Sequence, residues 1–134
     1  MILFFLGGIR EYQAFYLSLR EKWLKINFKY MKEITVQELK SMMDQNEEFQ
    51  LIDVRETFEY EVSHLNGINI PLAGILIESD KLSKDRPVII QCRSGKRSAQ
   101  AVMLLEQQGF TNLSNLKGGI LAWKEEIDPE IDVY

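Results

Sequence analysis

One stretch constrains the fold more than any other: an apolar run that stops at the only cysteine and is followed by an amphipathic helix. Residues 88–90 are β-branched and follow Pro87, which is typical of a buried strand. Apolar residues recur at helical spacing over 99–105, and Gly109 follows where a helix C-terminal cap is expected. The segment 92–97 is therefore predicted to be a strand-to-helix turn that opens onto the helix N-terminus.

This predicted turn is suited to hold an anion. The N–H groups of a first helical turn lack partners within the helix, and the helix dipole places partial positive charge there. Gly95 permits a positive φ that turns successive N–H groups toward one point, and Arg93, Lys96 and Arg97 add three formal positive charges. A lone cysteine at a strand end is most often a small buried apolar residue. Here the glycine and the cations favour a thiolate, so we predict that Cys92 is a nucleophile.

The segment CRSGKRS after the apolar strand resembles the active-site loop of rhodanese-like sulfurtransferases. The resemblance implies that Cys92 accepts a sulfane sulfur and holds it as a persulfide. It also implies that the rest of the loop binds the substrate, namely Arg93, Ser94, Gly95, Lys96, Arg97 and Ser98. From the residue type we further expect Ser98 to be the N-cap of the helix, with a role in orienting the loop coming second.

Cysteine-dependent phosphatases have a similar loop, but the spacing disfavours them here. They place an arginine six residues after the cysteine and usually a histidine before it, whereas Ser98 is the sixth residue, Arg97 is the fifth and Gln91 precedes the cysteine. A loop that is one residue shorter suits a single sulfur atom better than a tetrahedral phosphate.

A second segment, IDVRETFEYEVSHLNGINIPL at 52–72, is similar to the signature of the same family, as is LKGGILAW at 116–123. The resemblance implies that Asp53, Arg55 and Glu59 support the cysteine loop by hydrogen bonds and ion pairing. The alternative is a solvated surface ion-pair cluster that contributes little to stability. We expect His64 to be a hydrogen-bonded residue of the fold rather than a catalyst.

Strand and helix patterns alternate along the chain, which predicts an α/β fold with a parallel sheet covered by helices on both faces. Thr35 and Glu38 form a capping-box pattern for the first helix after a short strand at Ile34. The further expected elements are strands at 49–54, 68–71 and 112–116 and helices at 57–62 and 72–77. The resemblance implies the three-layer α/β/α rhodanese-like architecture with a five-stranded parallel sheet, over about residues 32–128.

Composition limits the cofactors and partners. A single cysteine forms no internal disulfide or cysteine-based zinc cluster, and His64 alone cannot supply a metal site, so we expect no metal. The exchange of sulfur that the resemblance implies needs no organic cofactor, so we expect none. The single cysteine also fits a reducing compartment, and we predict a cytoplasmic protein. A net charge of −4 provides no overall basic field, so we expect neither a nucleic-acid partner nor a membrane.

The first thirty residues are predicted to be a helical N-terminal extension, 1–30, ahead of a single domain at 31–134. The apolar start MILFFLGGI is too short to span a bilayer and lacks the features of a signal peptide. Apolar residues from Tyr12 to Ile26 share one helix face, which could pack on the domain, dimerise or lie on a membrane. Alternatively, translation begins at Met31 and the extension is not part of the native domain.

Two functions follow as hypotheses. In the first, the protein is a sulfurtransferase that takes sulfane sulfur from a small anion such as thiosulfate, or from another persulfide donor, and passes it to a thiol or cyanide. Because no resolving cysteine is present, the acceptor has to be external. In the second, the loop is a sulfur-carrier or docking module without turnover, which serves a sulfur-relay protein partner in cofactor biosynthesis or tRNA thiolation.

Overall fold

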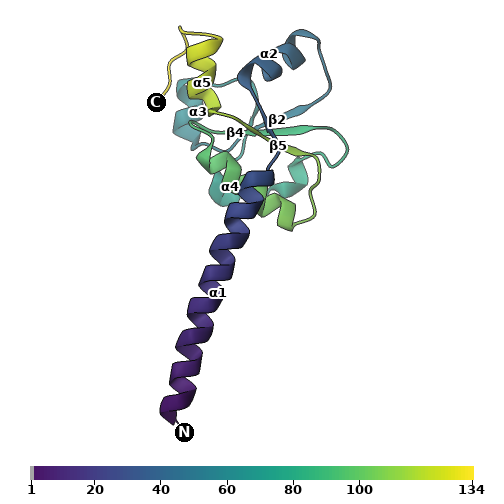
Figure 1. Cartoon of the computed structure of the whole chain (residues 1–134). Coiled ribbons are helices and arrows are strands. Elements are labelled where there is room, and N and C mark those ends of the chain that lie inside the picture. The colour runs from purple at the N-terminus through teal and green to yellow at the C-terminus, as the bar shows by residue number, and fades with distance from the viewer. Residues whose placement is uncertain (1) are drawn as a thin grey trace. The chain divides into compact units, whose positions relative to one another are not determined.

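The structure is a computed structural model that describes residues 2–134, with the side chains of residues 8–26 and 30–134. The chain divides into two compact units, one ending at Met31 and the other comprising Lys32–Tyr134. The first unit is a single helix, α1 (Ile2–Tyr30), drawn in purple and blue in Figure 1. Within the described part of the chain, no helix combines the length and the apolar character that crossing a bilayer requires.

The second unit is built on a five-stranded sheet in which the strand pairings are parallel. The strand order is β1-β5-β4-β2-β3, so that β4 lies at the centre. The strands are β1 (Glu33–Ile34), β2 (Gln50–Asp53), β3 (Ile68–Asn69), β4 (Val88–Gln91) and β5 (Leu113–Leu116). The five-stranded parallel sheet expected from the sequence is therefore confirmed.

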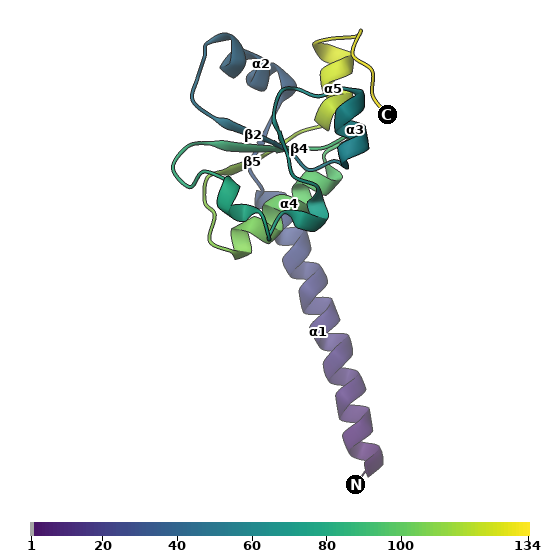
Figure 2. The same cartoon turned by 180° about the vertical axis from the view of Figure 1, so that it is seen from behind.

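Helices cover both faces of this sheet and complete the three-layer arrangement. In Figures 1 and 2, α2 and α5 lie on one side of the sheet and α4 lies on the other. The helices of the second unit are α2 (Val36–Asp44), α3 (Thr57–Val62), α4 (Lys96–Gln107) and α5 (Gly119–Glu126), with short 3₁₀ helices η1 (Leu72–Gly74) and η2 (Ser79–Lys81).

Helix starts and stops follow local sequence signals. Helix α2 begins at the predicted capping box, in which the Thr35 hydroxyl accepts the Glu38 N–H at 3.1 Å and the Glu38 carboxylate accepts the Thr35 N–H at 3.3 Å. The helix expected at 72–77 is shorter than predicted, because only η1 forms and turns follow it. Gly74 and the β-branched Ile75 are poor helix formers, which explains the early stop.

The central strand is buried on both faces, as its continuous β-branched run predicts. Ile89 faces α2 and α5, and Val88 and Ile90 face the other side because neighbouring strand residues alternate. The apolar cluster on the α2 and α5 side consists of Val36, Leu39, Leu51, Leu65, Ile89, Leu116, Ile120 and Trp123. Through Trp123, which belongs to this cluster, α5 packs onto the core.

Three loops meet at one edge of the sheet because the strands run in the same direction. Strand β2 ends at Asp53, which lies level with Gln91 at the end of β4. Cys92 follows Gln91 directly, and the glycine pair 118–119 follows β5. The fold therefore brings the Asp53 turn, the cysteine loop and the glycine pair to the same place.

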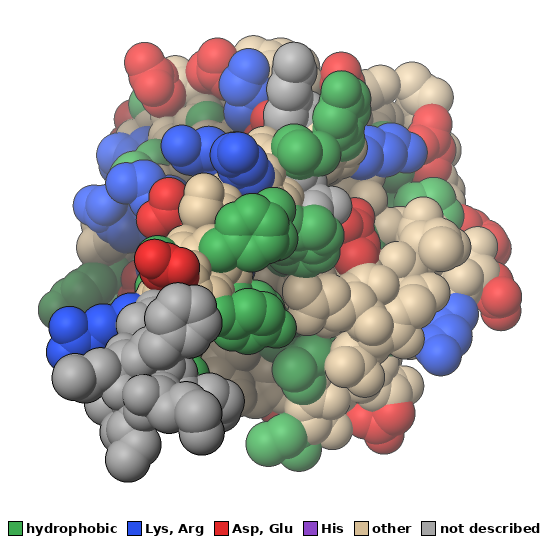
Figure 3. Space-filling view, turned by 60° about the horizontal axis from the view of Figure 1, so that its bottom comes forward, with side chains coloured by type: hydrophobic (Ala, Val, Ile, Leu, Met, Phe, Trp, Pro, Cys, Tyr) green, Lys and Arg blue, Asp and Glu red, His purple; other side chains and the backbone are tan. Residues whose placement is uncertain are grey.

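Surface charge is mixed on the face seen in Figure 3, where acidic and basic side chains are interspersed. Several Lys and Arg side chains lie near one another at the upper left of this view, with Asp and Glu side chains beside them.

Candidate functional site

Cys92 lies at the end of β4 with 1% of its surface exposed. Its sulfur faces the N-terminus of α4 and accepts two hydrogen bonds. The Gly95 N–H donates to Sγ at 3.1 Å, and the Ser98 hydroxyl donates at 3.3 Å. Two donors and the N-terminal end of a helix, where partial positive charge lies, converge on the sulfur.

Ser98 does not cap helix α4, contrary to the prediction from the sequence. The helix begins at Lys96, and its N-cap is Gly95 with a φ of 98°. Ser98 lies within the first turn and is fully buried, so its hydroxyl reaches the sulfur. The spacing of the apolar residues predicted a helix start that is too late. The first two helical residues, Lys96 and Arg97, are charged and therefore do not contribute to that spacing.

A second helix N-terminus holds the backbone of the cysteine loop. The N–H groups of Ile120 and Leu121 donate to the carbonyl oxygens of Cys92 and Arg93 at 2.9 and 3.1 Å. Gly119, at the start of α5, has a φ of 58°, and a β-carbon on it would meet both of these carbonyl oxygens. Helix α5 thus fixes the loop backbone and leaves no room for a side chain at position 119.

The three cations of the loop have different surroundings. Arg97 pairs with Glu59, with Nη1–Oε2 and Nη2–Oε1 distances of 2.6 and 2.9 Å. Arg93 is exposed and donates from Nε to the backbone oxygen of Tyr134 at 2.6 Å. Lys96 is exposed, and among the residues that the structure describes it has no ion-pair partner. Among the residues that the structure describes, no Asp or Glu side chain pairs with Arg93 or Lys96.

The position of Arg97 also bears on the phosphatase alternative. An arginine that binds a phosphoryl group uses the two parallel N–H groups of its guanidinium. In Arg97 these groups are engaged by Glu59, and the sixth residue after the cysteine is the buried Ser98. The geometry thus adds to the spacing argument against phosphoester hydrolysis. Ser94, the remaining predicted loop residue, is exposed.

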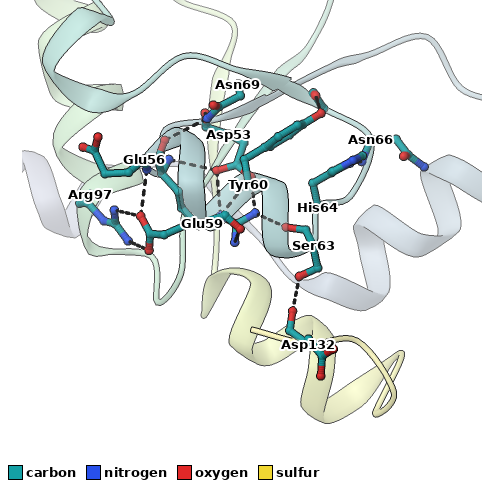
Figure 4. A network of polar contacts seen from close by, with 12 residues as sticks. Asp53, Glu56, Glu59, Tyr60, Ser63, His64, Asn66, Asn69, Arg97 and Asp132 are labelled. Carbon is teal, nitrogen blue, oxygen red and sulfur yellow. Dashed lines mark hydrogen bonds and ion pairs between the residues drawn. The ribbon is translucent and has the colours of Figure 1, made fainter. Parts of the chain in front are cut away.

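A buried polar network of Asp53, Arg55 and Glu59 is connected to the loop through Arg97, and Figure 4 labels Asp53, Glu59 and Arg97. The Arg55 guanidinium donates to the Asp53 carboxylate, with Nε–O distances of 3.0 and 3.1 Å and an Nη2–Oδ2 distance of 2.6 Å. Nη2 also donates to the Ser63 carbonyl at 2.9 Å. The three residues are 1%, 0% and 5% exposed, so the alternative of a solvated surface ion-pair cluster is wrong.

Glu59 connects this network to α4. Its carboxylate accepts both Arg97 N–H groups and also the Glu56 N–H at 2.9 Å (Figure 4). The hydrogen-bonded Arg97 guanidinium lowers the pKa of the Glu59 carboxyl below its ordinary value, against the opposing effect of burial. In return, Glu59 raises the pKa of Arg97. Both groups are thus charged at neutral pH.

We expect Glu59→Gln to make folding stability less sensitive to acid. A carboxyl whose pKa is lowered by folding stabilises the fold above its unfolded pKa, about 4.3 for glutamate, and this contribution is lost as the pH falls through the folded pKa. Urea denaturation between neutral pH and about pH 3.5 should show a smaller loss of unfolding free energy in Glu59→Gln than in the wild type. Glu61→Gln, at an exposed position of the same helix, is the control. Equal losses in the two variants would contradict the prediction.

His64 has a structural setting, as expected. Its Nδ1 accepts the Asn66 N–H at 3.0 Å, and its ring stacks on Tyr60 with centroids 4.1 Å apart. The Tyr60 hydroxyl donates to the Gly67 carbonyl at 2.7 Å. Figure 4 shows His64 and Tyr60 side by side, where they stabilise the segment that follows α3.

Two contacts with the loop were not predicted from the sequence. The Asn115 amide donates to the Gly95 carbonyl at 3.2 Å, and a polar residue inside the buried strand β5 was the available signal for it. The contact of Tyr134 with Arg93 uses a backbone oxygen, which gives no sequence signal. Over the part of the chain described, no three His, Cys, Asp or Glu side chains gather to hold a metal ion.

Comparison with known proteins finds one family. The family model described as a rhodanese-like domain matches residues 35–126. A sulfurtransferase from Allochromatium vinosum is 37% identical over 94 residues, which cover 69% of this chain and 88% of that protein. The putative sulfur carrier protein YrkF from Bacillus subtilis is 33% identical over 98 residues, covering 72% of this chain and 53% of that protein.

The chain is also similar to part of a much longer protein. The probable adenylyltransferase/sulfurtransferase MoeZ from Mycobacterium tuberculosis is 32% identical over 104 residues, covering 75% of this chain but 26% of MoeZ. Among solved structures, a rhodanese-like domain protein from Staphylococcus aureus superposes with a TM-score of 0.67 at 31% identity, covering 78% of this chain and 99% of that one.

Proposed function

Because the chain belongs to the rhodanese-like domain family, we propose that it is a sulfurtransferase that moves a sulfane sulfur through a persulfide on Cys92. The observation that carries the proposal is the pair of hydrogen bonds from Gly95 and Ser98 to the buried sulfur. These donors favour negative charge on Sγ, and negative charge is what makes a thiol nucleophilic.

The first half of the reaction loads the sulfur. A thiosulfate-like donor brings its anionic end to Arg93 and Lys96, the two loop cations that pair with no Asp or Glu side chain among the described residues. The Cys92 thiolate attacks the outer sulfur, a new S–S bond forms, and the S–S bond of thiosulfate breaks. Sulfite leaves with the electron pair of that bond. The terminal sulfur of the persulfide then carries the negative charge at the base of the loop, where the backbone N–H groups of residues 93–98 surround it.

The second half of the reaction unloads the sulfur. A thiol or cyanide attacks the terminal sulfur, and the bond between the two sulfurs breaks so that Cys92 returns to the thiolate. The protein has a single cysteine, so the acceptor is external. The exchange needs no metal or organic cofactor. A reducing compartment such as the cytoplasm keeps the thiol available. We assign the activity to residues 31–134 and treat residues 1–30 as an extension.

We expect purified protein to form thiocyanate from thiosulfate and cyanide, and we expect Cys92→Ser to reduce the rate to the background without protein. Intact mass spectrometry after incubation with thiosulfate should show the mass of one added sulfur atom in the wild type and none in the variant. Circular dichroism and the urea midpoint report whether the variant is folded. Unchanged thiocyanate formation by a folded Cys92→Ser protein would refute the proposal.

The similarity to a putative sulfur carrier supports a second candidate, a carrier or docking module that receives sulfur from a relay protein and has little turnover of its own. Slow turnover with thiosulfate, together with rapid sulfur uptake from a protein persulfide, would favour the carrier. Comparable turnover with both donors would favour the enzyme.

A further inference from the structure

The side chains of α1, drawn as one continuous helix in Figure 1, follow the heptad repeat of coiled coils. In this repeat, apolar residues occupy the a and d positions, which recur at alternating spacings of three and four residues. The a and d positions of α1 from residue 9 onward hold Ile9, Tyr12, Tyr16, Leu19, Trp23 and Ile26, and Tyr30 continues the spacing at the end of the helix. The charged residues of the same stretch all lie at other positions. These seven residues therefore form one apolar stripe, the a/d stripe.

The a/d stripe is exposed. Its seven residues have 42–75% of their surface accessible. The unit that contains α1 ends at Met31, and between residues 2 and 31 it holds no second helix or strand. A helix buries an apolar stripe only against another element. A partner that covers the stripe therefore comes from outside this unit.

The spacing favours another helix as the partner over a flat surface. A repeat of 3.5 residues drifts by about 20° per heptad around a straight α-helix, so over three heptads the stripe turns by roughly 60°. A membrane surface is flat and covers only part of such a stripe, whereas a second helix follows it by supercoiling. Each copy of this chain carries a helix with the required repeat, namely α1 itself.

The size of the stripe matches what a stable dimer needs. Four of its seven residues are aromatic, and these side chains are the largest available for burial. Aromatic side chains bury about 150–250 Å² each, so at the exposures above the stripe offers roughly 800 Å² per copy. A standard specific interface also takes about 800 Å² from each partner.

We propose that two copies of the chain associate through the a/d stripes of their α1 helices as a two-stranded coiled coil. Dimers with two-fold symmetry are the commonest oligomers of soluble proteins, and an identical stripe on each copy makes the contact self-complementary. The association does not depend on the proposed sulfurtransferase function, because we assign that activity to residues 31–134. A dimer holds two cysteine loops in one particle.

The test compares two leucines of α1 that differ in heptad position. Leu19 belongs to the stripe, whereas Leu17 lies outside it, and the two are similarly exposed, at 47% and 54%. Sedimentation equilibrium of the full chain from about 1 to about 100 μM should show a dimer of the 15.7 kDa chain, because association follows mass action. Leu19→Ala should raise the dissociation constant at least about tenfold, since each dimer loses two leucine side chains from its interface. Leu17→Ala makes the same chemical change and should leave the dissociation constant unchanged.

A second variant, Leu19→Glu, places a charge in the stripe and should be monomeric at all of these concentrations. Circular dichroism reports whether each variant keeps its fold. A monomeric wild type would overturn the inference, and so would a dimer that Leu19→Ala and Leu17→Ala weaken equally, because the contact would then lie elsewhere. A wild type that is monomeric in solution and floats with phosphatidylcholine–phosphatidylglycerol vesicles would identify a membrane as the partner and would also overturn it.

Discussion

Replacing Asp53 with asparagine should lower the free energy of unfolding by about 3–5 kcal/mol, because it leaves a buried guanidinium without its counter-charge. Arg55 is fully buried, and the Asp53 carboxylate accepts from its Nε and Nη2. The exposed Lys40–Asp44 pair is the matched control. Asp44→Asn should cost less than about 1 kcal/mol, because water already solvates both charges.

Removing both charges should be far less costly than removing one. A double variant, Asp53→Leu with Arg55→Met, replaces the ion pair with apolar side chains and leaves no unpaired buried charge, so much of the stability should return. Urea denaturation of the single and double variants at neutral pH gives the comparison. If Asp53→Asn had the same urea midpoint as the wild type, burial would not increase the contribution of this ion pair to stability.

The same double variant tests whether the network positions the loop. Arg55 also donates to the carbonyls of Ser63 and Glu59, at 2.9 and 3.4 Å, and these bonds hold α3 in the place from which Glu59 reaches Arg97. A stable double variant should therefore still load sulfur more slowly than the wild type. If the double variant loaded sulfur at the wild-type rate, Asp53 and Arg55 would contribute to stability alone.

Local patterns in the sequence predicted the elements around the site well. The β-branched run at 88–90 and the capping box at Thr35 each act within a few residues, so the strand and the helix they predict are present. The predicted start of α4 was wrong. The helix begins after a glycine N-cap with two charged residues, so no apolar residue at helical spacing marks its first positions. The burial of Asp53 and Arg55 also lay beyond local patterns, since charged residues are mostly exposed.

Side-chain partners that lie far apart along the chain could not be predicted from spacing. The loop cations Arg93 and Arg97 appear equivalent in the sequence. Arg97 is paired because α3 presents Glu59 to it, and Arg93 meets the backbone of Tyr134 because the last residues pack along the core. These differences depend on the assembled fold, which decides which of the predicted anion-binding cations pairs with a carboxylate side chain.

Gly119→Ala should reduce the second-order rate constant for sulfur loading about a hundredfold, the scale of loss that accompanies a misplacement of about 1 Å at a reacting group. The added β-carbon would lie 2.6 Å from the Arg93 carbonyl oxygen and closer still to that of Cys92. Both oxygens are held by N–H groups of α5, so the cysteine loop has to move to make room. Its movement takes the Gly95 N–H away from the sulfur.

Gly109→Ala separates this collision from the strain of a positive φ. Gly109 has a φ of 96°, but apart from its own atoms and those of its chain neighbours, no atom lies within 4 Å of the place where its β-carbon would be. The Gly109 variant should therefore lose only about 1–2 kcal/mol of stability, the cost of a left-handed conformation, and keep its rate of sulfur loading. Stopped-flow loading with thiosulfate, followed by intact mass, compares the two variants with the wild type. If the Gly119 and Gly109 variants loaded sulfur at equal rates, the loop would be able to adapt to a side chain at position 119. The hydrogen bonds from α5 to the Cys92 and Arg93 carbonyl oxygens would then not determine the position of the sulfur.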